Sequence, residues 1–367
     1  MTPLNSLKQD QQDINFKLGE FFCGPGGIAL GAINSGKVID NNDISYSITP
    51  SWATDYDEDT CKTYSKNIHQ TEKHKDVIHN DVRKLNIEKL DGCDGFAFGF
   101  PCNDFSIVGE TKGLNGNFGP LYSYGVQYLK AHQPKWFIAE NVSGLSSANG
   151  GKAFKTIIDA LGDANYIITP HLYKFERYGV PQARHRIIIV GIRRDIDVNF
   201  KVPAPTHESS FKTSFEALTV PSIPDNAKNH ERTKQSKQVV ERLKHIGPGE
   251  NAWSENIPEE LRLNVKGARL STIYKRLHPD KPAYTVTGSG GGGTHMYHWE
   301  EPRALTNRER ARLQTFPDDF IFFGSKESIR KQIGMAVPPE GIKIIFQAIL
   351  NSFAGNKYDH IPSNIKV

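Results

Sequence analysis

Short apolar runs alternate with segments of helical periodicity through the first half of the chain. The apolar runs have the length of buried strands and lie at residues 17–22, 51–54, 77–80, 94–100, 135–139, 166–168 and 187–190. Helical patterns separate several of them, at residues 28–33, 58–67 and 121–132. Strands that alternate with helices are typical of a parallel sheet with helices on both faces. The pattern therefore predicts an α/β fold built on a doubly wound, mostly parallel sheet.

Polar or reactive residues follow these apolar runs, close to where each predicted strand ends. In chain order they are Gly24 and Gly26, Asp55, Asp81, Cys102 and Glu140. In doubly wound sheets, ligands bind beyond the carboxyl ends of the strands. We therefore expect these residues to share one site.

The first predicted strand ends in the glycine-rich turn Cys23-Gly24-Pro25-Gly26-Gly27. A strand, a glycine turn and a helix open many nucleotide-binding units. The spacing Gly24-x-Gly26-x-x-Ala29 fits the dinucleotide fingerprint only loosely. Pro25 also removes a backbone N–H that a phosphate group would use. The turn therefore favours a nucleoside cofactor that carries no phosphates.

Asp55 and Tyr56 follow the second predicted strand. A carboxylate at this place can hold the ribose diol of a nucleoside, and the adjacent ring can stack on a purine. The same acidic stretch also fits a turn that caps the helix at 58–67. The residues alone leave both interpretations open.

The apolar run 94–100 ends at Pro101 and Cys102. A buried strand followed by a proline, whose φ is fixed, can hold a thiol nucleophile in one place. A buried structural thiol is the competing interpretation, because free cysteines are among the most buried residues. Residues 103–120 are rich in glycine and predict a long loop beside a site. Together with the other strand-end residues, this favours a nucleophile.

Composition and charge set broad limits on the function. The chain has 367 residues, of which 37% are hydrophobic and 23% charged, as in one large globular domain or two unequal ones. A net charge of +4 is compatible with nucleic acid but falls short of a strongly basic footprint. The four cysteines form no C-x-x-C pair, so we expect no metal site and no disulfide framework.

The start of the chain and its hydropathy predict a cytoplasmic location. Residues 1–17 are polar and lack the apolar core of a signal peptide. No apolar run approaches the length of a membrane span, so we expect no membrane partner.

The second half of the chain lacks the regular alternation of apolar runs and helical segments. Prolines near residues 202–205 and 220–224 interrupt any periodicity, and residues 232–245 predict a basic helix with one apolar face. Residues 289–294 predict a glycine-rich segment that suits contact with a phosphate backbone, or merely a loop. Thr306 and Glu309 predict a capping box at the start of a helix, and residues 342–350 fit an amphipathic helix.

Several motifs in both halves occur in one order. They are Phe22-Cys23-Gly24-Pro25-Gly26-Gly27, Phe100-Pro101-Cys102-Asn103-Asp104-Phe105-Ser106, Glu140-Asn141-Val142, Gln182-Ala183-Arg184-His185-Arg186, Arg303 to Glu309 with Leu313-Gln314-Thr315-Phe316-Pro317, and Gln332-Ile333-Gly334-Met335-Ala336-Val337-Pro338-Pro339. This ordered set resembles the motifs of DNA (cytosine-5) methyltransferases of the bacterial restriction–modification type. The similarity runs from about residue 17 to residue 350. One departure is Met335, which stands where the family usually has asparagine.

The resemblance implies a Rossmann-like methyltransferase sheet with S-adenosylmethionine as cofactor, which suits Pro25. By similarity, Asp55 would hold the ribose, Tyr56 would pack on the adenine, and Asp81 and Val82 would bind its edge. The cofactor-binding residues implied in this way are Phe22, Gly24, Gly26, Gly27, Asp55, Tyr56, Asp81, Val82, Pro101, Leu121 and Ala336.

The catalytic residues implied by the resemblance are Cys102, Glu140, Arg184 and Arg186. Cys102 would be the covalent nucleophile, and Glu140 would hydrogen-bond the target base. The two arginines would hold the ring oxygen and a flanking phosphate, with their individual roles left open. The target cytosine must leave the base stack for this chemistry.

The resemblance also implies a division into domains and a set of partners. Residues 1–194 and 331–367 would form a large catalytic and cofactor-binding domain. Residues 195–330 would form a small domain, with the target-recognition region at about 195–274. The implied partner is double-stranded DNA, with a cognate restriction endonuclease acting on the same site without a stable complex. We expect a monomer, because the enzyme faces one flipped base.

Three alternatives share part of this pattern. A tRNA cytosine methyltransferase would use the same catalytic residues, but the chain lacks the Cys-Phe-Thr triplet of similar tRNA enzymes. A non-catalytic binding relative would be expected to lose Cys102, Glu140 or the glycine turn, and all are present. An NAD-dependent dehydrogenase conflicts with Pro25 and lacks a constellation for hydride transfer.

Overall fold

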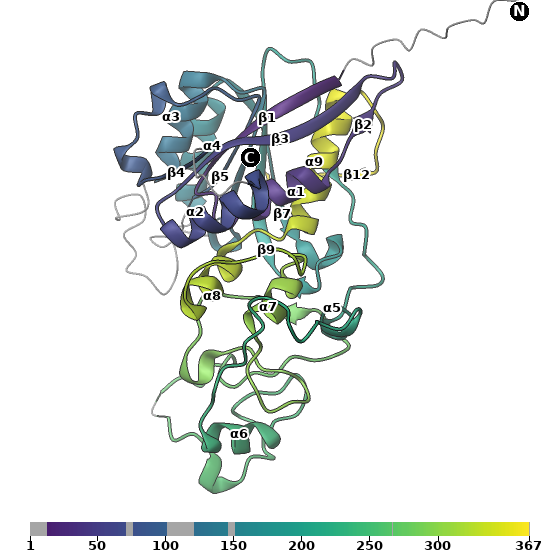
Figure 1. Ribbon diagram of the computed structural model, residues 1–367. Coiled ribbons are helices and arrows are strands. Elements are labelled where there is room, and N and C mark those ends of the chain that lie inside the picture. Colours follow the sequence, from purple (N-terminus) through teal and green to yellow (C-terminus); the bar gives the residue numbers. More distant parts are fainter. Residues whose placement is uncertain (1–12, 71–75, 101–120, 146–150, 266, 367) are drawn as a thin grey trace, which may run out of the picture.

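The structure is a computed structural model that describes residues 13–70, 76–100, 121–145, 151–265 and 267–366 (Figure 1). Its body is built on an eight-stranded sheet in the order β2-β3-β1-β5-β6-β9-β7, with β4 beside β3. The strands are β1 (Asp13–Phe21), β2 (Val38–Ile39), β3 (Ser45–Asp55), β4 (Val77–His79), β5 (Gly95–Gly99), β6 (Trp136–Val142), β7 (Tyr166–Lys174) and β9 (His185–Arg193).

Most neighbouring strands of this sheet run parallel. β1 pairs in this way with β3 and β5, β3 with β4, and β5 with β6. β9 runs antiparallel between β6 and β7, and β2 runs antiparallel to β3. A parallel return needs a crossover of about a dozen residues or more, usually through a helix. The segment 175–184 between β7 and β9 contains no α-helix and is too short for such a crossover. The mostly parallel α/β sheet is confirmed, with one reversed strand in its interior.

Helices cover both faces of the sheet (Figure 1). On one face, α1 (Gly27–Asn34) and α9 (Pro339–Phe353) share a core with Trp136 of β6. On the other face, α3 (Tyr122–His132) and α4 (Lys152–Gly162) share a core with Phe137, the next residue of β6. Successive side chains of a strand point to opposite faces, which explains how one strand serves both cores. The sheet is therefore doubly wound, as the alternating pattern predicts.

The C-terminal segment returns to the start of the sheet. A Cβ added at Gly27 of α1 would lie 2.2 Å from the carbonyl oxygen of Val337, so backbone meets backbone at this contact. Only glycine permits such a close approach. Residues 337–353 thus pack against α1.

One stretch of the described residues, Lys326–Phe353, is long and apolar enough to cross a membrane by length and composition. This corrects the expectation that no stretch reaches that length. The stretch consists of α8 (Lys326–Met335) and α9, and 72% of its most apolar window is buried inside the protein. Burial of this kind is typical of core helices.

The remaining elements are short. Beside the sheet lie α2 (Glu58–Tyr64), which continues into a π-helical turn (Ser65–His69), and short 3₁₀ turns (Val82–Lys84, Ile87–Lys89 and Phe175–Tyr178). The second half adds short strands, β8 (Gln182–Ala183), β10 (Val202–Pro203), β11 (Ala283–Tyr284) and β12 (His360–Ile361). It also adds α5 (Ser214–Thr219), α6 (Lys237–Lys244), α7 (Asn307–Leu313) and 3₁₀ turns (Glu259–Leu261 and Gly292–Thr294).

The basic helix expected at 232–245 is shorter in the structure, because α6 begins only at Lys237. The side chain of Ser236 caps it by accepting a hydrogen bond from the amide of Val239, at 3.3 Å. The residues before it make contacts outside the helix instead: the side chain of Gln235 accepts a hydrogen bond from the Ala304 amide at 3.1 Å. Tertiary contacts therefore end the helical pattern early.

A small core of its own lies in the part of the molecule around α6. It contains Leu243, Ile246, Tyr274 and Tyr297, whereas α7 and α8 share a core with α1 and α2. α7 and α8 lie between the sheet and this lower part (Figure 1). The separate core fits a small domain, and the domain bounds 195–330 stay a prediction.

Candidate active site at the carboxyl edge of the sheet

The turn after β1 is held against the end of β3. The amide of Gly24 donates a hydrogen bond to Oδ2 of Asp55 at 3.0 Å. Gly24 has φ of 56° and Gly26 has φ of 99°, a conformation that favours glycine. A Cβ at Gly24 would meet no atom within 4 Å among the described residues, so this side of the turn is open. The turn thus presents backbone to a space that a ligand can fill.

Asp55 and Asp57 divide the two roles that the sequence left open. Asp55, the last residue of β3, holds the glycine turn and also accepts a hydrogen bond from the Asp57 amide at 3.0 Å. Asp57 caps α2 by accepting a hydrogen bond from the Thr60 amide at 2.9 Å. Burial raises the pKa of the Asp55 carboxyl. The carboxylate predicted to hold a ribose therefore lies beside the open turn.

Tyr56 is exposed next to Asp55. Its hydroxyl accepts a hydrogen bond from Nζ of Lys331 at 3.0 Å, and that ammonium lies 5.5 Å from the ring centroid. Lys331 belongs to α8, so the C-terminal part of the chain reaches the residue predicted to pack on adenine.

Asp81 and Val82 follow β4 at the same edge of the sheet. The Asp81 carboxylate accepts hydrogen bonds from Nε of Arg83 at 2.9 and 3.0 Å, and these bonds lower its pKa to about 2. Val82 is buried in the same core as Leu121, the residue that precedes α3. Any contact of Asp81 with a ligand must therefore be shared with Arg83.

Phe22 and Ala336 complete the described part of the predicted cofactor set. Phe22 has φ of 54° at the start of the glycine turn and is partly buried. Ala336 is buried directly after α8 and just before Val337, which touches Gly27. The structure therefore brings Phe22 and Ala336, from opposite ends of the chain, to the glycine turn.

The strand register brings Glu140 to the end of β5. Glu140 of β6 lies opposite Gly99, the last residue of β5. Pro101 and Cys102, with the predicted loop 103–120, lie outside the described residues. Asn141 follows Glu140, and its Nδ2 donates a hydrogen bond to the carbonyl oxygen of Phe100 at 3.0 Å. This buried contact holds the chain just before Pro101.

Glu140 forms an ion pair with Arg186. Nε of Arg186 lies 2.9 Å from Oε1 of Glu140, with side chains 14% and 12% exposed, respectively. The two residues lie on neighbouring antiparallel strands, β6 and β9. A nearly buried ion pair of this kind can polarise a ring that enters the site.

Arg184 has a different environment from Arg186. Its side chain is 1% exposed, and its Nη1 donates a hydrogen bond to the carbonyl oxygen of Val286 at 3.1 Å. Burial lowers the pKa of the Arg184 guanidinium, and the charge of Arg186 lowers it further. The two arginines that the sequence treats alike are therefore not equivalent: Arg184 contacts the second half of the chain, and Arg186 contacts Glu140.

Two glutamines that received no role from the sequence tie this edge together. Nε2 of Gln182 donates to Oε1 of Gln314 at 2.9 Å, and Oε1 of Gln182 accepts from the Val286 amide at 2.7 Å. Nε2 of Gln314 donates to the carbonyl oxygen of Ile333 at 2.6 Å. Both glutamines stand in the ordered motifs, which was the only signal of their importance. They connect β8, the segment at 286, α7 and α8.

Glu20 is a third residue that sequence reasoning missed. It is buried in β1 behind the glycine turn, where Oε2 accepts a hydrogen bond from the Tyr64 hydroxyl at 3.0 Å. Oε1 is buried and has no hydrogen-bond partner within the part of the chain that the structure describes. Burial raises the pKa of this carboxyl to about 8. Glu20 is therefore protonated in the folded protein at neutral pH.

This proton makes stability depend on pH. The unfolded chain releases it near pH 4.5, whereas the folded protein keeps it to about pH 8. The free energy of unfolding should therefore fall as pH rises through this window, by up to about 1.4 kcal/mol per pH unit. Glu20→Gln should remove this slope. Chemical denaturation of both proteins at a series of pH values measures the effect, and parallel curves would contradict it.

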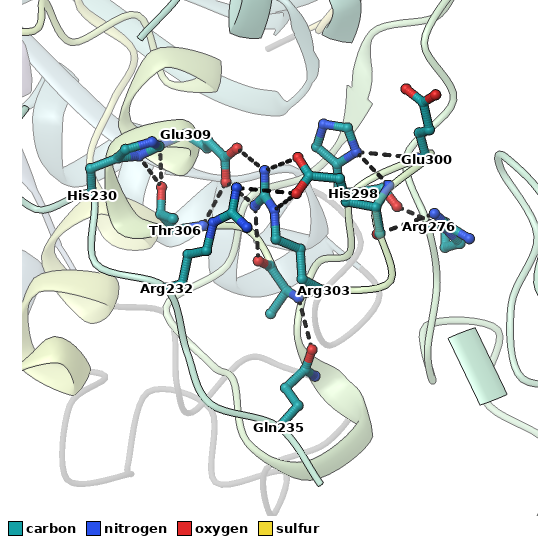
Figure 2. A network of polar contacts seen from close by, with 11 residues as sticks. His230, Arg232, Gln235, Arg276, His298, Glu300, Arg303, Thr306 and Glu309 are labelled. Atoms are coloured by element: carbon teal, nitrogen blue, oxygen red, sulfur yellow. Dashed lines mark hydrogen bonds and ion pairs between the residues drawn. The ribbon is translucent and has the colours of Figure 1, made fainter. Parts of the chain in front are cut away.

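A polar network joins the start of α7 to residues between His230 and Arg303 (Figure 2). Arg303 binds Glu309 through both carboxylate oxygens at 2.8 Å and also binds Glu301 at 2.9 Å. The predicted capping box of Thr306 and Glu309 is confirmed. His230 lies 2.9 Å from the Thr306 hydroxyl. The carboxylates near the start of α7 are thus already paired.

A surface cavity of about 340 Å³ lies at the opposite, amino edge of the sheet, lined by Ile167, Arg194 and Asp197 among others. None of the predicted site residues lines it. It is therefore no candidate for the reaction.

Comparison with known proteins agrees with this geometry. The chain matches the family model of C-5 cytosine-specific DNA methylases over residues 16–351. It is 60% identical over 357 residues to the Type II methyltransferase M.BbvI of Brevibacillus brevis, with 95% of each chain covered. It is 30% identical to the DNA (cytosine-5-)-methyltransferase M.ApeKI of Aeropyrum pernix, covering 89% of this chain and 97% of that one.

Among solved structures, the Entamoeba histolytica methyltransferase EhMeth has the same fold, with a TM-score of 0.62 at 16% identity over 94% of this chain and 99% of that one. The family match over most of the chain rules out the dehydrogenase. The chain belongs to the C-5 cytosine-specific DNA methylases and is an enzyme of the DNA (cytosine-5-)-methyltransferase class.

Proposed function

We propose that this protein transfers a methyl group from S-adenosylmethionine to carbon 5 of a flipped-out cytosine in a short duplex sequence, through a covalent bond to Cys102. One observation carries the proposal. The Glu140–Arg186 pair, at 2.9 Å, stands opposite the end of β5, the strand that leads to Cys102. The open glycine turn and Asp55 lie at the same carboxyl edge of the sheet.

The residues around the glycine turn fit S-adenosylmethionine. Gly24 presents its backbone to open space, and Asp55 offers a carboxylate beside it for a ribose diol. Pro25 lacks an N–H, which a cofactor without phosphates does not need. When bound there, the cofactor would supply an electrophilic methyl group.

Cys102 makes carbon 5 of the cytosine reactive. That carbon is too weak a nucleophile to take a methyl group directly. Attack of the Cys102 thiolate on carbon 6 forms a sulfur–carbon bond and moves the ring electrons towards carbon 5 as an enamine. After carbon 5 has accepted the methyl group, its proton passes to water. The electron pair re-forms the ring double bond and expels the thiolate.

Glu140 and Arg186 stabilise the charge that builds on the ring. Glu140 shares a proton with ring nitrogen 3 and accepts a hydrogen bond from the amino group. Arg186 donates to the ring oxygen while it orients Glu140. Arg184, which is buried and bound to the carbonyl oxygen of Val286, acts as a positioning residue that ties the site to the second half of the chain.

Bisulfite sequencing of genomic DNA tests the reaction directly. A methylation-free bacterial host would express the wild type or the Cys102→Ser variant. We expect protected cytosines within one short sequence, only with the wild type. If soluble wild type protects no cytosine, the DNA substrate is wrong, and host tRNA is the next substrate to test.

Asp55→Ala should weaken cofactor binding about 10- to 100-fold, because it removes charged hydrogen bonds to a ribose. DNA affinity should change much less. Calorimetry with S-adenosylmethionine and a DNA-binding assay measure the two effects. Asp55→Asn keeps an acceptor for the Gly24 amide, and should separate loss of the charge from loss of the turn. Asp163→Ala, at the exposed end of α4, is the control. Unchanged cofactor affinity in Asp55→Ala would refute the assignment.

The proposed partner is double-stranded DNA, bound by a monomer in the cytoplasm. The name Type II methyltransferase, carried by the relative M.BbvI, supports a restriction–modification setting. In that setting, a cognate endonuclease would act on the same DNA sequence without a stable complex.

A further inference from the structure

A cavity of about 110 Å³ lies between the glycine-rich segment at residues 290–291, α7 and α8. Its walls include Gly290, Gly291, His295, Arg310 of α7 and Arg330 of α8. None of these residues belongs to the predicted cofactor or catalytic set. The cavity therefore needs an explanation of its own.

Two arginine side chains in its wall have unused donors. Arg310 is 1% exposed, and its Nη2 is buried without a hydrogen-bond partner among the described residues. Its Nη1 has only a long contact of 3.5 Å with the carbonyl oxygen of Thr287. Arg330 is 12% exposed, and its buried Nε likewise has no partner in the described ranges. Buried donors normally find an acceptor, so each of these N–H groups is available to one.

The neighbouring carboxylates do not neutralise these two charges. Glu309, next to Arg310, binds Arg303 through both oxygens (Figure 2). Glu327 lies 3.9 Å from Nη1 of Arg330, and its side chain is 73% exposed. Glu231 also lines the cavity but is exposed. The carboxylates thus lie at the solvent side, whereas the guanidinium groups lie inside.

The like charges also act on each other. Burial, together with the charge of Arg330, lowers the pKa of Arg310 to about 10. Burial lowers the pKa of His295 to about 4, again helped by both arginines. A buried guanidinium with unpaired donors, or with only one long ion pair as in Arg330, destabilises a fold. A counter-anion at this place would relieve that cost.

The glycine segment lies directly on one of the arginines. A Cβ at Gly290 would come within 2.7 Å of Nε of Arg330, so a side chain here would collide with the guanidinium. The segment is anchored behind this contact: the Tyr297 hydroxyl donates to the carbonyl oxygen of Gly292 at 3.1 Å. The amide of Tyr274 donates to the carbonyl oxygen of Gly293 at 2.7 Å. The backbone can therefore stay close to an anion held by Arg330.

The same segment leads to the candidate active site. Val286, which accepts the hydrogen bond of Arg184, stands shortly before Gly290 in the chain. Thr287, between them, contacts Arg310. A ligand in the cavity would therefore be linked through residues 286–290 to the site of the flipped base.

We propose that this cavity binds one backbone phosphate of the DNA, with Arg310 and Arg330 as its donors and Gly290 as the residue that admits it. The inference rests on the proposed function, because it presumes a bound DNA duplex. It assigns two residues that the ordered motifs leave without a role. A guanidinium pair of this kind suits phosphate oxygens, which accept several N–H bonds at once.

Single phosphates of the DNA can be neutralised to test this. The probe is a duplex with the sequence that bisulfite sequencing defines, made with one neutral methylphosphonate at each backbone position in turn. For the wild type, one position should weaken binding about tenfold. For Arg330→Gln, binding of the unmodified duplex should weaken to a similar degree, and the same methylphosphonate should have no further effect. The slope of log affinity against log salt should fall by about one.

Three further variants separate binding from folding. Gly290→Ala changes no charge and should still weaken binding, because its methyl group displaces Arg330. Arg330→Lys should recover part of the affinity. Lys155→Gln removes one exposed charge from α4 and should leave the methylphosphonate pattern unchanged. Calorimetry with S-adenosylmethionine should give the wild-type affinity for all of them, which shows that the fold is intact.

Two results would overturn the inference while the proposed function stands. One is that the wild type methylates a specific sequence, but every methylphosphonate weakens binding equally in the wild type and in Arg330→Gln. The other adds a stability measurement to the same methylphosphonate result. Inorganic phosphate, compared with chloride at equal ionic strength, raises the melting temperature of the wild type but not that of Arg330→Gln. The cavity would then hold a free anion. Absence of DNA methylation by the wild type would instead refute the proposed function, and this inference with it.

Discussion

Replacing Cys102 by serine is expected to lower methyl transfer to DNA by roughly a thousandfold or more. The reaction begins with attack on carbon 6 of the cytosine, and a thiolate is available near neutral pH where an alkoxide is not. Binding of S-adenosylmethionine should be unchanged, because the predicted cofactor contacts come from the turn at Gly24 and from Asp55. Transfer of a labelled methyl group to a defined duplex measures the rate, and calorimetry measures cofactor binding.

Cys93 offers a matched control. It lies just before β5, at the other end of the strand that leads to Cys102, and its Sγ is 3.2 Å from the Tyr128 hydroxyl. Serine can keep that hydrogen bond, so Cys93→Ser should retain activity. Equal activity of wild type and Cys102→Ser would exclude the covalent mechanism. Loss of activity in both variants would point to a folding defect instead.

Glu140→Gln is expected to lower the rate of methyl transfer by about 10²- to 10³-fold, with little change in DNA affinity. The amide cannot share a proton with ring nitrogen 3 as a carboxylate does. It still has an oxygen that accepts a hydrogen bond from Arg186, so the local geometry should persist. Single-turnover kinetics at saturating DNA separates the chemical step from binding.

Glu176 is the matched control for this second variant. It is also a nearly buried glutamate paired with β9, since its Oε1 lies 2.8 Å from Nε2 of His185 and its side chain is 13% exposed. Glu176→Gln should leave the single-turnover rate within about twofold of the wild type, a change of less than about 1 kcal/mol. A normal rate for Glu140→Gln would remove Glu140 from the mechanism. A large loss in both variants would attribute the effect to packing at this edge.

The sequence by itself determined the α/β class, the ends of several elements and the edge of the sheet where the candidate site lies. These features depend on contacts between residues close in the chain and on the general geometry of parallel sheets. Alternation of apolar runs and helical segments is set by burial of each element on its neighbours. The capping box of Thr306 and Glu309 joins residues within one turn of helix. The carboxylate after β3 and the glycine turn after β1 meet because parallel strands end at one edge.

Only the tertiary structure determines which residues that lie far apart in the chain contact one another. It reversed β9, because the segment before that strand cannot form a crossover. It also separated Arg184 from Arg186. Arg186 forms an ion pair with Glu140 of the neighbouring strand β6, whereas Arg184 binds the carbonyl oxygen of Val286. Val286 lies 102 residues after Arg184 in the chain, so the sequence pattern around Arg184 does not predict this contact.

The same holds for the glutamine pair and for the cavity. Gln182 and Gln314 are 132 residues apart in the chain, yet their side chains share a hydrogen bond. Arg310 and Arg330 stand on different helices, and α7 and α8 bring them to the wall of one cavity. A local sequence pattern predicts the helix or strand that a segment forms. The partner of a buried side chain depends instead on how separate segments pack against one another. That packing turned separate motifs into a site and exposed a candidate phosphate contact.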